Sequence, residues 1–209
     1  TGHWSVKAIA EAKRYCNVHI CSDSSANNFT DIEDFYDWKV DEDAAYFHYT
    51  PNETIAGLEF DYIPDVSMPI AADMSSTILS REIDISKYGV IYAGAQKNIG
   101  PSGLTIVIVR DDLIGHAVNG QPKLFDYATQ ANNDSMFNTP ATFPWYAAGR
   151  VFEWIKEKGG LSAMQAINKA KAESLYSAID NSDFYSNPVS MKYRSWMNVP
   201  FLLADEKLN

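Results

Sequence analysis

The sequence predicts an α/β fold in which helices flank a mainly parallel sheet, and three observations support this. Three short apolar runs, 44–49, 68–72 and 88–93, end in polar or turn-forming residues, as buried strands do. Residues 75–87, between the second run and the third, have about the length that a parallel crossover requires. Long segments with apolar residues at helical spacing follow after residue 140.

The N-terminal part is expected to begin with a helix over 5–16, which is rich in alanine, lysine and glutamate and has Ser5 as a capping residue. Residues 18–21 are a candidate short strand. Residues 27–43 are acidic and rich in turn-forming residues, so they should lie at the surface. The strand that follows leads into a turn at 51–54 at one edge of the sheet.

Two polar residues come directly after predicted strands. Asp73 follows the strand 68–72, and Lys97 comes soon after the strand 88–93. Because these strands are expected to be parallel, both residues should emerge at the same edge of the sheet, where ligands bind in open α/β sheets. The strand 104–109 lies close enough in sequence to return antiparallel to its predecessor.

Two helices are predicted in the C-terminal half. Asn138-Thr139-Pro140 is typical of a helix start and precedes a helical pattern over 143–158. Gly159-Gly160 ends that helix, and a second helix is expected over 161–179.

The double glycine is therefore the predicted domain boundary. Residues 1–158 are assigned to a large domain, and residues 159–209 to the start of a small α+β C-terminal domain. Within the second part, 196–203 is expected to form a strand.

Composition excludes several classes of function. Seventeen lysines and arginines against 27 acidic residues give a net charge of -10, which repels a phosphate backbone and argues against nucleic-acid binding. The longest strongly apolar run, 104–109, is far shorter than the roughly 20 residues of a membrane span. No secretory signal precedes the first helix, and the two cysteines, Cys16 and Cys21, are expected to be reduced thiols in the cytoplasm. The chain starts at Thr1 without a methionine, which suggests a fragment.

Common catalytic and metal-binding motifs are missing from the sequence. The four histidines are scattered without the spacing of a zinc helix, so no metal site is expected. There is no G-x-S-x-G elbow, phosphate loop or G-x-G-x-x-G fingerprint. The pair of Asp73 and Lys97 remains.

Lys97 and Asp73 together suit an aldehyde cofactor. Desolvation at a strand end would lower the pKa of Lys97 and make it a nucleophilic amine that can form an imine. An aspartate on the neighbouring strand could pair with the protonated pyridine nitrogen of pyridoxal phosphate. The alternatives are that Lys97 is an ordinary solvated lysine and that Asp73 only caps the turn at Ser75-Ser76.

Two segments carry a specific resemblance. Residues 72–81, ADMSSTILSR, and 88–101, YGVIYAGAQKNIGP, closely resemble the phosphoserine aminotransferase family. This family belongs to class V of the fold-type I pyridoxal phosphate-dependent transferases, whose fold is like that of aspartate aminotransferase. The resemblance spans the chain and also covers Gly2–Ser5, His48–Thr54, Ser135–Pro140 and Met197–Phe201.

The resemblance implies roles for individual residues. Lys97 matches the Schiff-base lysine and Asp73 the partner of the pyridine nitrogen. Trp4 matches the aromatic residue that stacks on the cofactor ring, Thr54 a cofactor-contacting hydroxyl, and Gln96 a contact to the cofactor phosphate. Without the resemblance, Trp4 would be taken as a core residue and Thr54 as part of a turn.

A homodimer is also implied. Asn138 and Thr139 match a pair that reaches the cofactor phosphate of the neighbouring subunit, and a helix N-terminus is a suitable anion site. The active unit would then have an isologous interface. The alternative for Thr139 is a simple cap on a helix that starts at Pro140.

In this family an amino group moves from glutamate to 3-phosphohydroxypyruvate, giving phosphoserine and 2-oxoglutarate in serine biosynthesis. The related phosphohydroxythreonine of pyridoxal phosphate biosynthesis is a possible second substrate. Lys97 would also carry the proton between the substrate carbon and the cofactor as general base and acid.

The family is longer than this chain at both ends. Its upstream Gly-Arg pair and its substrate-binding basic residues fall outside the 209 residues. The alternatives are therefore a non-catalytic truncated fragment, or another class V enzyme such as a serine-pyruvate aminotransferase. A cysteine desulfurase is disfavoured, because Cys16 and Cys21 do not lie on a mobile reactive loop.

Overall fold

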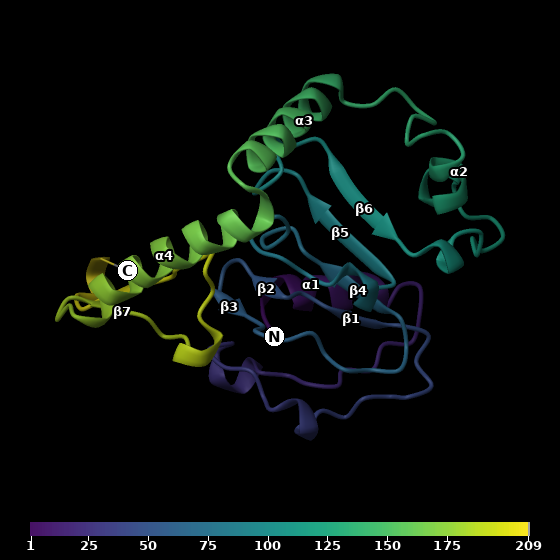
Figure 1. The fold of residues 1–209 in the computed structure, drawn as a ribbon. Coiled ribbons are helices and arrows are strands. Elements are labelled where there is room, and N and C mark those ends of the chain that lie inside the picture. Colours follow the sequence, from purple (N-terminus) through teal and green to yellow (C-terminus); the bar gives the residue numbers. More distant parts are fainter. Residues whose placement is uncertain (209) are drawn as a thin grey trace.

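A four-stranded sheet forms the centre of the computed structural model, which describes residues 1–208 (Figure 1). Its strands are β1 (Phe47–Tyr49), β4 (Ile70–Asp73), β5 (Val90–Gly94) and β6 (Thr105–Val109). They lie in the order β1-β4-β5-β6, with the first three parallel and β6 antiparallel to β5. The α/β class, the parallel crossover and the antiparallel return predicted from the sequence are confirmed.

Side chains alternate between the two faces of this sheet, as the pleat of a strand requires. Ile91 and Ala93 of β5 are buried in the main hydrophobic core together with Ala72 of β4. The opposite face carries polar groups, among them Asp73 and Tyr92, which are paired across β4 and β5. The sheet therefore separates an apolar core from a polar surface at its carboxyl edge.

A buried two-stranded ribbon lies between β1 and β4 in the sequence. Its strands β2 (Asn52–Glu53) and β3 (Leu58–Glu59) are antiparallel, and all four of their residues are buried. The ribbon holds two buried carboxylates, Glu53 on β2 and Glu59 on β3. Such groups require hydrogen-bonded or charged partners.

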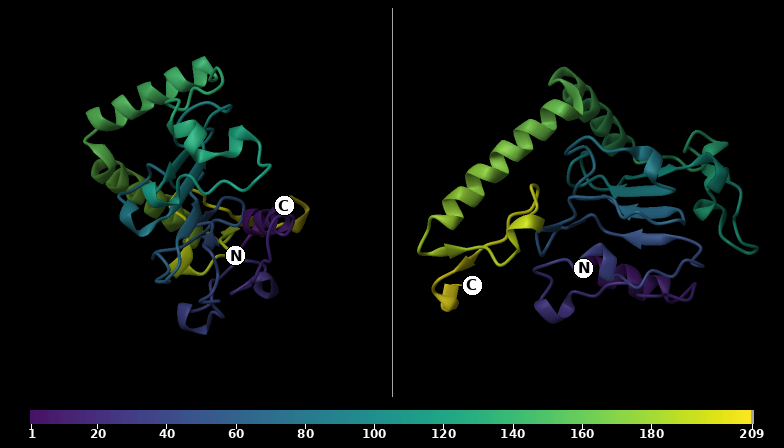
Figure 2. Two further views of the ribbon diagram at one scale, coloured as in Figure 1. Left: turned by 90° about the vertical axis from the view of Figure 1, so that its right-hand side faces the viewer. Right: turned by 60° about the horizontal axis from the view of Figure 1, so that its bottom comes forward.

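Four α-helices accompany the strands in the described part of the chain. They are α1 (His3–Ala12), α2 (Tyr127–Ala131), α3 (Thr142–Glu157) and α4 (Gly160–Asp180). Gly159, with φ at 102°, separates α3 from α4 in the left-handed conformation that favours glycine. Figures 1 and 2 show α4 leading away from the sheet toward the small pair β7 (Tyr185–Ser186) and β8 (Leu202–Leu203). Short 3₁₀ turns complete the chain, at Ser25–Asn27, Phe35–Asp37, Ile85–Lys87, Asp111–Leu113, Lys123–Phe125, Met191–Tyr193 and Glu206–Leu208.

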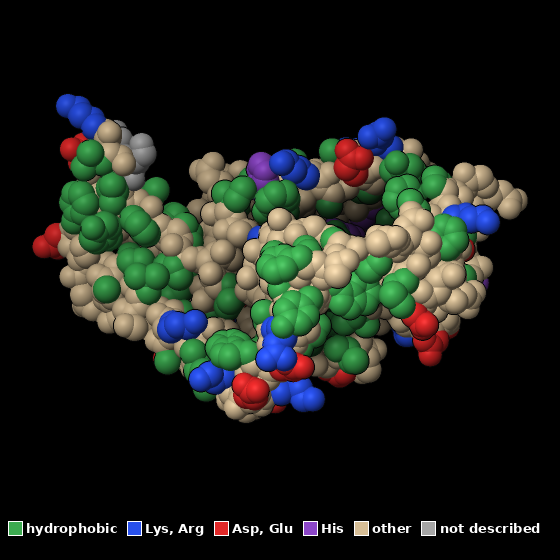
Figure 3. Space-filling model, turned by 90° about the horizontal axis from the view of Figure 1, so that it is seen from above, with side chains coloured by type: hydrophobic (Ala, Val, Ile, Leu, Met, Phe, Trp, Pro, Cys, Tyr) green, Lys and Arg blue, Asp and Glu red, His purple; other side chains and the backbone are tan. Residues whose placement is uncertain are grey.

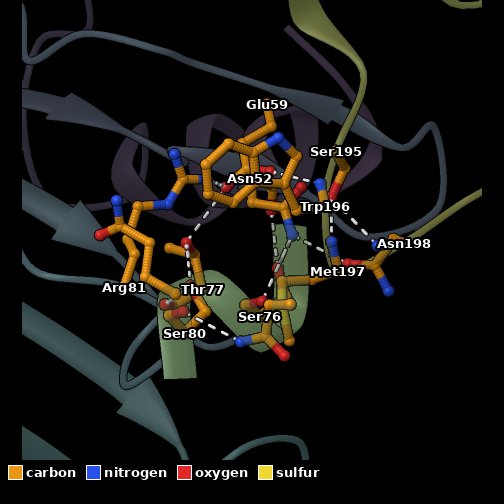
Figure 4. A network of polar contacts seen from close by, with 12 residues as sticks. Asn52, Glu59, Ser76, Thr77, Ser80, Arg81, Ser195, Trp196, Met197 and Asn198 are labelled. Carbon is orange, nitrogen blue, oxygen red and sulfur yellow. Dashed lines mark hydrogen bonds and ion pairs between the residues drawn. The ribbon is translucent and has the colours of Figure 1, made fainter. Parts of the chain in front are cut away.

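The segment 194–198 returns from α4 to the β2–β3 ribbon, as Figure 4 shows. The Ser195 N–H donates to the Gly57 carbonyl at 2.9 Å. The Trp196 N–H donates to Glu59 Oε2 at 2.8 Å, and Asn52 Nδ2 donates to Asn198 Oδ1 at 2.8 Å. These bonds connect the C-terminal part of the chain to the ribbon beside the sheet.

Some predicted elements differ from the structure. Residues 18–21 form no strand, because no strand of the described chain pairs with them. The first helix begins at His3 with Gly2 as N-cap, since Ser5 donates to Glu53 instead of capping. Of 196–203, only Leu202–Leu203 pairs as a strand, because the Trp196 N–H is taken by the Glu59 side chain.

No helix within residues 1–208 combines the length and apolar character needed to cross a bilayer. No group of three or more His, Cys, Asp or Glu side chains there could hold a metal ion. Cys16 and Cys21 are both free thiols.

Candidate active site

The carboxyl ends of β4 and β5 meet at one edge of the sheet, as predicted. Asp73 is the last residue of β4 and is paired with Tyr92 of β5. After Gly94 the chain makes a tight turn, in which the Gly100 N–H donates to the Ala95 carbonyl at 2.8 Å. This turn holds Lys97 at the surface.

Lys97 contacts two other predicted site residues. Its Nζ donates to Thr54 Oγ1 at 2.5 Å and lies 5.7 Å from the centroid of the Trp4 ring. Thr54 follows β2, and Trp4 belongs to the first turn of α1. The fold therefore gathers an amine, a hydroxyl and an indole from three segments.

The environment of Lys97 favours its neutral form. Partial burial lowers the pKa of the ammonium below its ordinary value, and the negative charges of Asp73 and Glu53 oppose part of this shift. A lowered pKa increases the fraction of free amine, which is the nucleophilic form. The direction of this shift suits a lysine that reacts as a free amine.

Asp73 caps a turn with one of its two carboxylate oxygens. Its Oδ1 accepts hydrogen bonds from the Ser75 N–H at 3.0 Å and from the Ser75 hydroxyl at 2.6 Å. The Gly94 N–H in turn donates to Ser75 Oγ at 3.1 Å, which links the ends of β4 and β5. Within residues 1–208, Asp73 Oδ2 makes none of the described hydrogen bonds. The capping role considered from the sequence is therefore present, and it leaves one oxygen for a ligand.

His48 and Tyr92 lie on the same face of the sheet as Asp73, and sequence reasoning assigned neither a role. His48 Nε2 and the Tyr92 hydroxyl are 2.9 Å apart. Burial lowers the pKa of His48, while Asp73 and Glu53 oppose the shift. Burial, followed by the charge of Asp73, raises the pKa of Tyr92. Both groups are therefore neutral at physiological pH and add polarity without charge.

Glu53 is the other residue of the site that sequence reasoning missed. It is 0% exposed, and its carboxylate accepts hydrogen bonds from Trp4 and Ser5 at the start of α1. The available signal was an acidic residue adjoining the predicted contact Thr54 in an otherwise buried segment.

Gln96 is exposed beside Lys97, and its side chain folds over Gly94. A Cβ atom on Gly94 would lie 2.5 Å from Gln96 Oε1, so the side-chain position depends on this glycine. Gln96 therefore lies at the same edge of the sheet as Lys97, as expected.

Asn138 and Thr139 do not join the cluster around Lys97. Both are exposed in the connection between α2 and α3, which Figure 1 shows beyond the outer strand β6. The expectation that Thr139 caps a helix starting at Pro140 is wrong, because α3 begins at Thr142 with Ala141 as its N-cap. Both side chains are therefore accessible at the surface of the chain.

The family model described as aminotransferase class-V matches residues 1–208. A phosphoserine aminotransferase from Ruthia magnifica subsp. Calyptogena magnifica is 72% identical over 209 residues, which cover 100% of this chain and 58% of the relative.

Two solved structures are also similar. The phosphoserine aminotransferase from Bacillus circulans subsp. alkalophilus has a TM-score of 0.96 at 44% identity and is matched over 100% of this chain and 58% of its own. The phosphoserine aminotransferase from Trichomonas vaginalis, whose structure is of the pyridoxal phosphate-bound form, has a TM-score of 0.92 at 43% identity. That match covers 99% of this chain and 62% of the Trichomonas chain. The chain therefore spans less than two thirds of each of these three proteins.

Proposed function

The chain belongs to the aminotransferase class-V family, and we propose that it is the lysine-bearing part of a pyridoxal phosphate-dependent phosphoserine aminotransferase. The observation that carries this proposal is the environment of Lys97. Its amine has a lowered pKa, donates to Thr54 and faces the Trp4 ring, at the edge of the sheet where Asp73 ends β4.

The chemistry of these groups fits pyridoxal phosphate. The cofactor has an aldehyde, a flat aromatic ring and a ring nitrogen that takes up a proton. Lys97 supplies an amine, Trp4 a large aromatic face and Asp73 a carboxylate with one oxygen uncommitted within residues 1–208. Each reactive part of the cofactor therefore has a partner of suitable chemistry.

Each residue of the site would have a separate role in the reaction. Lys97 would hold the aldehyde carbon until the substrate amine displaces it, and the freed Nζ would then carry a proton from the substrate carbon to the cofactor. Asp73 Oδ2 would keep the ring nitrogen protonated, Trp4 would cover the ring, and Thr54 and Gln96 would contact the cofactor. When bound, the cofactor supplies an electron sink for the bond that is broken at the substrate carbon.

The proposed substrates are glutamate and 3-phosphohydroxypyruvate, with phosphoserine and 2-oxoglutarate as products. The amino group and the α-hydrogen pass formally from glutamate to the keto acid while the carbonyl oxygen passes the other way, so the exchange needs no external oxidant or reductant. High identity to the phosphoserine aminotransferase from Ruthia magnifica over the whole chain supports this assignment and a place in serine biosynthesis. We propose phosphohydroxythreonine, an intermediate of pyridoxine biosynthesis, as a second substrate, and an assay of its transamination with 2-oxoglutarate tests this directly.

The test is borohydride reduction of the purified protein after addition of pyridoxal phosphate. Reduction is expected to attach a pyridoxyl group to Lys97, identified by peptide mapping and by the loss of visible absorbance. Lys87, an exposed lysine of the crossover between β4 and β5, is the internal control and should stay unlabelled.

Two results would contradict the proposal. Labelling spread over several exposed lysines, without preference for Lys97, would remove the assigned site. Absence of label both in the 209 residues and in a longer version of the protein would remove the cofactor. Label in the longer version alone would support the site and identify this chain, taken by itself, as non-catalytic.

We also propose a homodimer in which Asn138 and Thr139 approach the cofactor phosphate of the neighbouring subunit. The support comes from α3, which follows these residues directly. Phe143, Tyr146 and Trp154 are 70%, 65% and 46% exposed and recur at helical spacing on one side of α3. Figure 3, which looks down on the side where Figure 1 draws α3, has hydrophobic side chains spread over this face. Such a patch favours a protein interface.

Tyr146→Glu is expected to convert the dimer to a monomer, because a charge would be buried in an apolar interface. Sedimentation or light scattering gives the mass. Tyr36→Glu is the matched control, since Tyr36 is 97% exposed on a distant 3₁₀ turn and its variant should stay dimeric. A parent protein that is monomeric at micromolar concentration would rule out the dimer.

The division into 1–158 and 159–209 is likewise our proposal, with support from Gly159 and from the course of α4 away from the sheet. Separate unfolding of the two parts, once the bonds between them are removed, is the expected sign of such a boundary.

Two free thiols are compatible with a reducing compartment, so we assign the protein to the cytoplasm, which fractionation of cells would test. We expect neither nucleic acid nor membrane as a partner, given the net charge of -10.

A further inference from the structure

Glu53 is a fully buried carboxylate that binds the start of a helix from a distant part of the chain. Its Oε2 accepts from the Trp4 N–H at 3.0 Å, and its Oε1 accepts from the Ser5 N–H at 2.8 Å and the Ser5 hydroxyl at 2.5 Å. These amides lie in the first turn of α1, where N–H groups have no partner within the helix. A negative charge at this end also interacts favourably with the helix dipole.

The local packing leaves little freedom for this cap. Gly2, the N-cap residue of α1, is buried against the Glu53 side chain. A Cβ atom at position 2 would lie 2.5 Å from Glu53 Cγ and Cδ, which is too close for any other residue without movement. The carboxylate and the helix start are therefore fitted to each other.

Neighbouring residues of the same segment serve different parts of the site. Glu53 binds the backbone of Trp4, and Thr54, the next residue, accepts from Lys97. The Trp4 ring lies 5.7 Å from Lys97 Nζ. Residues 53 and 54 therefore contact both Trp4 and Lys97, which also lie next to each other. The position of the indole over the amine thus depends on where Glu53 holds the helix.

We propose that Glu53 is a positioning residue that holds the Trp4 indole over the cofactor site by capping α1. Glu53 itself touches neither the substrate nor the cofactor in this role and acts through Trp4. The inference rests on the proposed function for its cofactor part, whereas the cap itself is independent of any ligand.

Two substitutions separate the cap from the charge of Glu53. Glu53→Asp keeps the negative charge but shortens the side chain by one methylene, so the carboxylate no longer reaches both amides. Glu53→Gln keeps the reach but removes the charge, and because Glu53 raises the pKa of Lys97, this variant should lower that pKa further. Ser5→Ala removes only the hydroxyl bond and is the mildest variant.

The first readout is amide hydrogen exchange without cofactor. Glu53→Asp is expected to raise the exchange rates of the Trp4 and Ser5 amides about tenfold, in line with the loss of a helix cap. Glu59→Gln is the matched control, because Glu59 is the other buried carboxylate of the ribbon and binds the Trp196 N–H. It should accelerate exchange at Trp196 and leave Trp4 and Ser5 unchanged.

The second readout is a double-mutant cycle on the dissociation constant for pyridoxal phosphate, measured by absorbance. Glu53→Asp should weaken binding about tenfold in the parent and have no effect in a Trp4→Ala background, because Glu53 acts through Trp4. An equal weakening in both backgrounds would reduce Glu53 to a structural role and overturn the proposal. Unchanged exchange at Trp4 and Ser5 would overturn it as well.

The outcomes also distinguish this inference from the proposed function. If neither the 209 residues nor a longer version of the protein binds the cofactor, the proposed function and the cofactor part of the inference are both contradicted. Cofactor binding with no coupling between Glu53 and Trp4 would leave the function in place and remove the inference alone. If Glu53→Asp does not fold, Ser5→Ala carries the same cycle with a smaller expected effect of about threefold.

Discussion

Under the proposed function, replacing Lys97 by alanine is expected to abolish transamination, with a loss of roughly 10⁴-fold or more in kcat, because the proposed nucleophile and proton carrier would disappear together. The fold should persist. Lys97 is exposed and makes one described hydrogen bond, to Thr54, so the free energy of unfolding should change by about 0.5 kcal/mol or less. Turnover of glutamate with 3-phosphohydroxypyruvate measures the activity, and equilibrium unfolding in urea measures the stability.

Two further variants sharpen this experiment. Lys97→Arg should be as inactive as alanine, because a guanidinium keeps the positive charge but does not supply a free amine. Lys87→Ala removes another exposed lysine and should retain parental turnover. The assay uses the protein at the full length of its relatives, since this chain spans 58% of the one from Ruthia magnifica. Normal turnover by Lys97→Ala would contradict the proposed catalytic role of Lys97.

The placement of Asp73 and Lys97 at one edge of the sheet could be predicted, because it depends on a pattern that is continuous in the sequence. Two short apolar runs separated by a crossover of sufficient length give parallel strands, and parallel strands end at one edge. Each residue needed only its place after a strand. The same logic gave the antiparallel return of β6, whose distance along the chain from β5 is short.

The role of Glu53 could not be predicted because its partners are distant in sequence. It caps a helix that begins about fifty residues earlier, and an acidic residue in a turn-like motif is normally taken as solvated. For the same reason the sequence pattern placed the cap at Ser5. The apolar pattern over 196–203 was misleading in a similar way, because the Trp196 N–H bonds to a side chain instead of a neighbouring strand.

Glu59→Ala is expected to destabilise the protein by roughly 3 kcal/mol, the lower end of the cost of breaking a buried ion pair, because the Arg81 side chain that remains is 21% exposed. Arg81 pairs with Glu59 and lies over the Trp196 ring, with its Cζ 4.5 Å from the ring centroid. Glu59 is 4% exposed and also accepts from the Trp196 N–H and the Thr77 hydroxyl. Urea unfolding should give a lower midpoint at an unchanged slope.

An exposed pair provides the control for Glu59. Lys169 and Glu173 form an ion pair on α4 with side chains 55% and 66% exposed, so Glu173→Ala should change stability by about 0.5 kcal/mol or less. A loss below about 1 kcal/mol in Glu59→Ala would mean that the carboxylate is not paired as described. The difference between the two variants is therefore the effect of burial on the same kind of pair.

The double variant Glu59→Leu with Arg81→Met tests which partner matters most. Removing both charges should recover part of the loss, because no unpaired charge remains buried. The Trp196 N–H would still lack its acceptor, so a deficit of about 1–3 kcal/mol should persist. Since this bond helps to tie the segment after α4 to the β2–β3 ribbon, its loss should accelerate amide exchange at Trp196 more than at Ile91 of the sheet. Equal acceleration at both amides would argue instead that the two parts unfold as one cooperative unit.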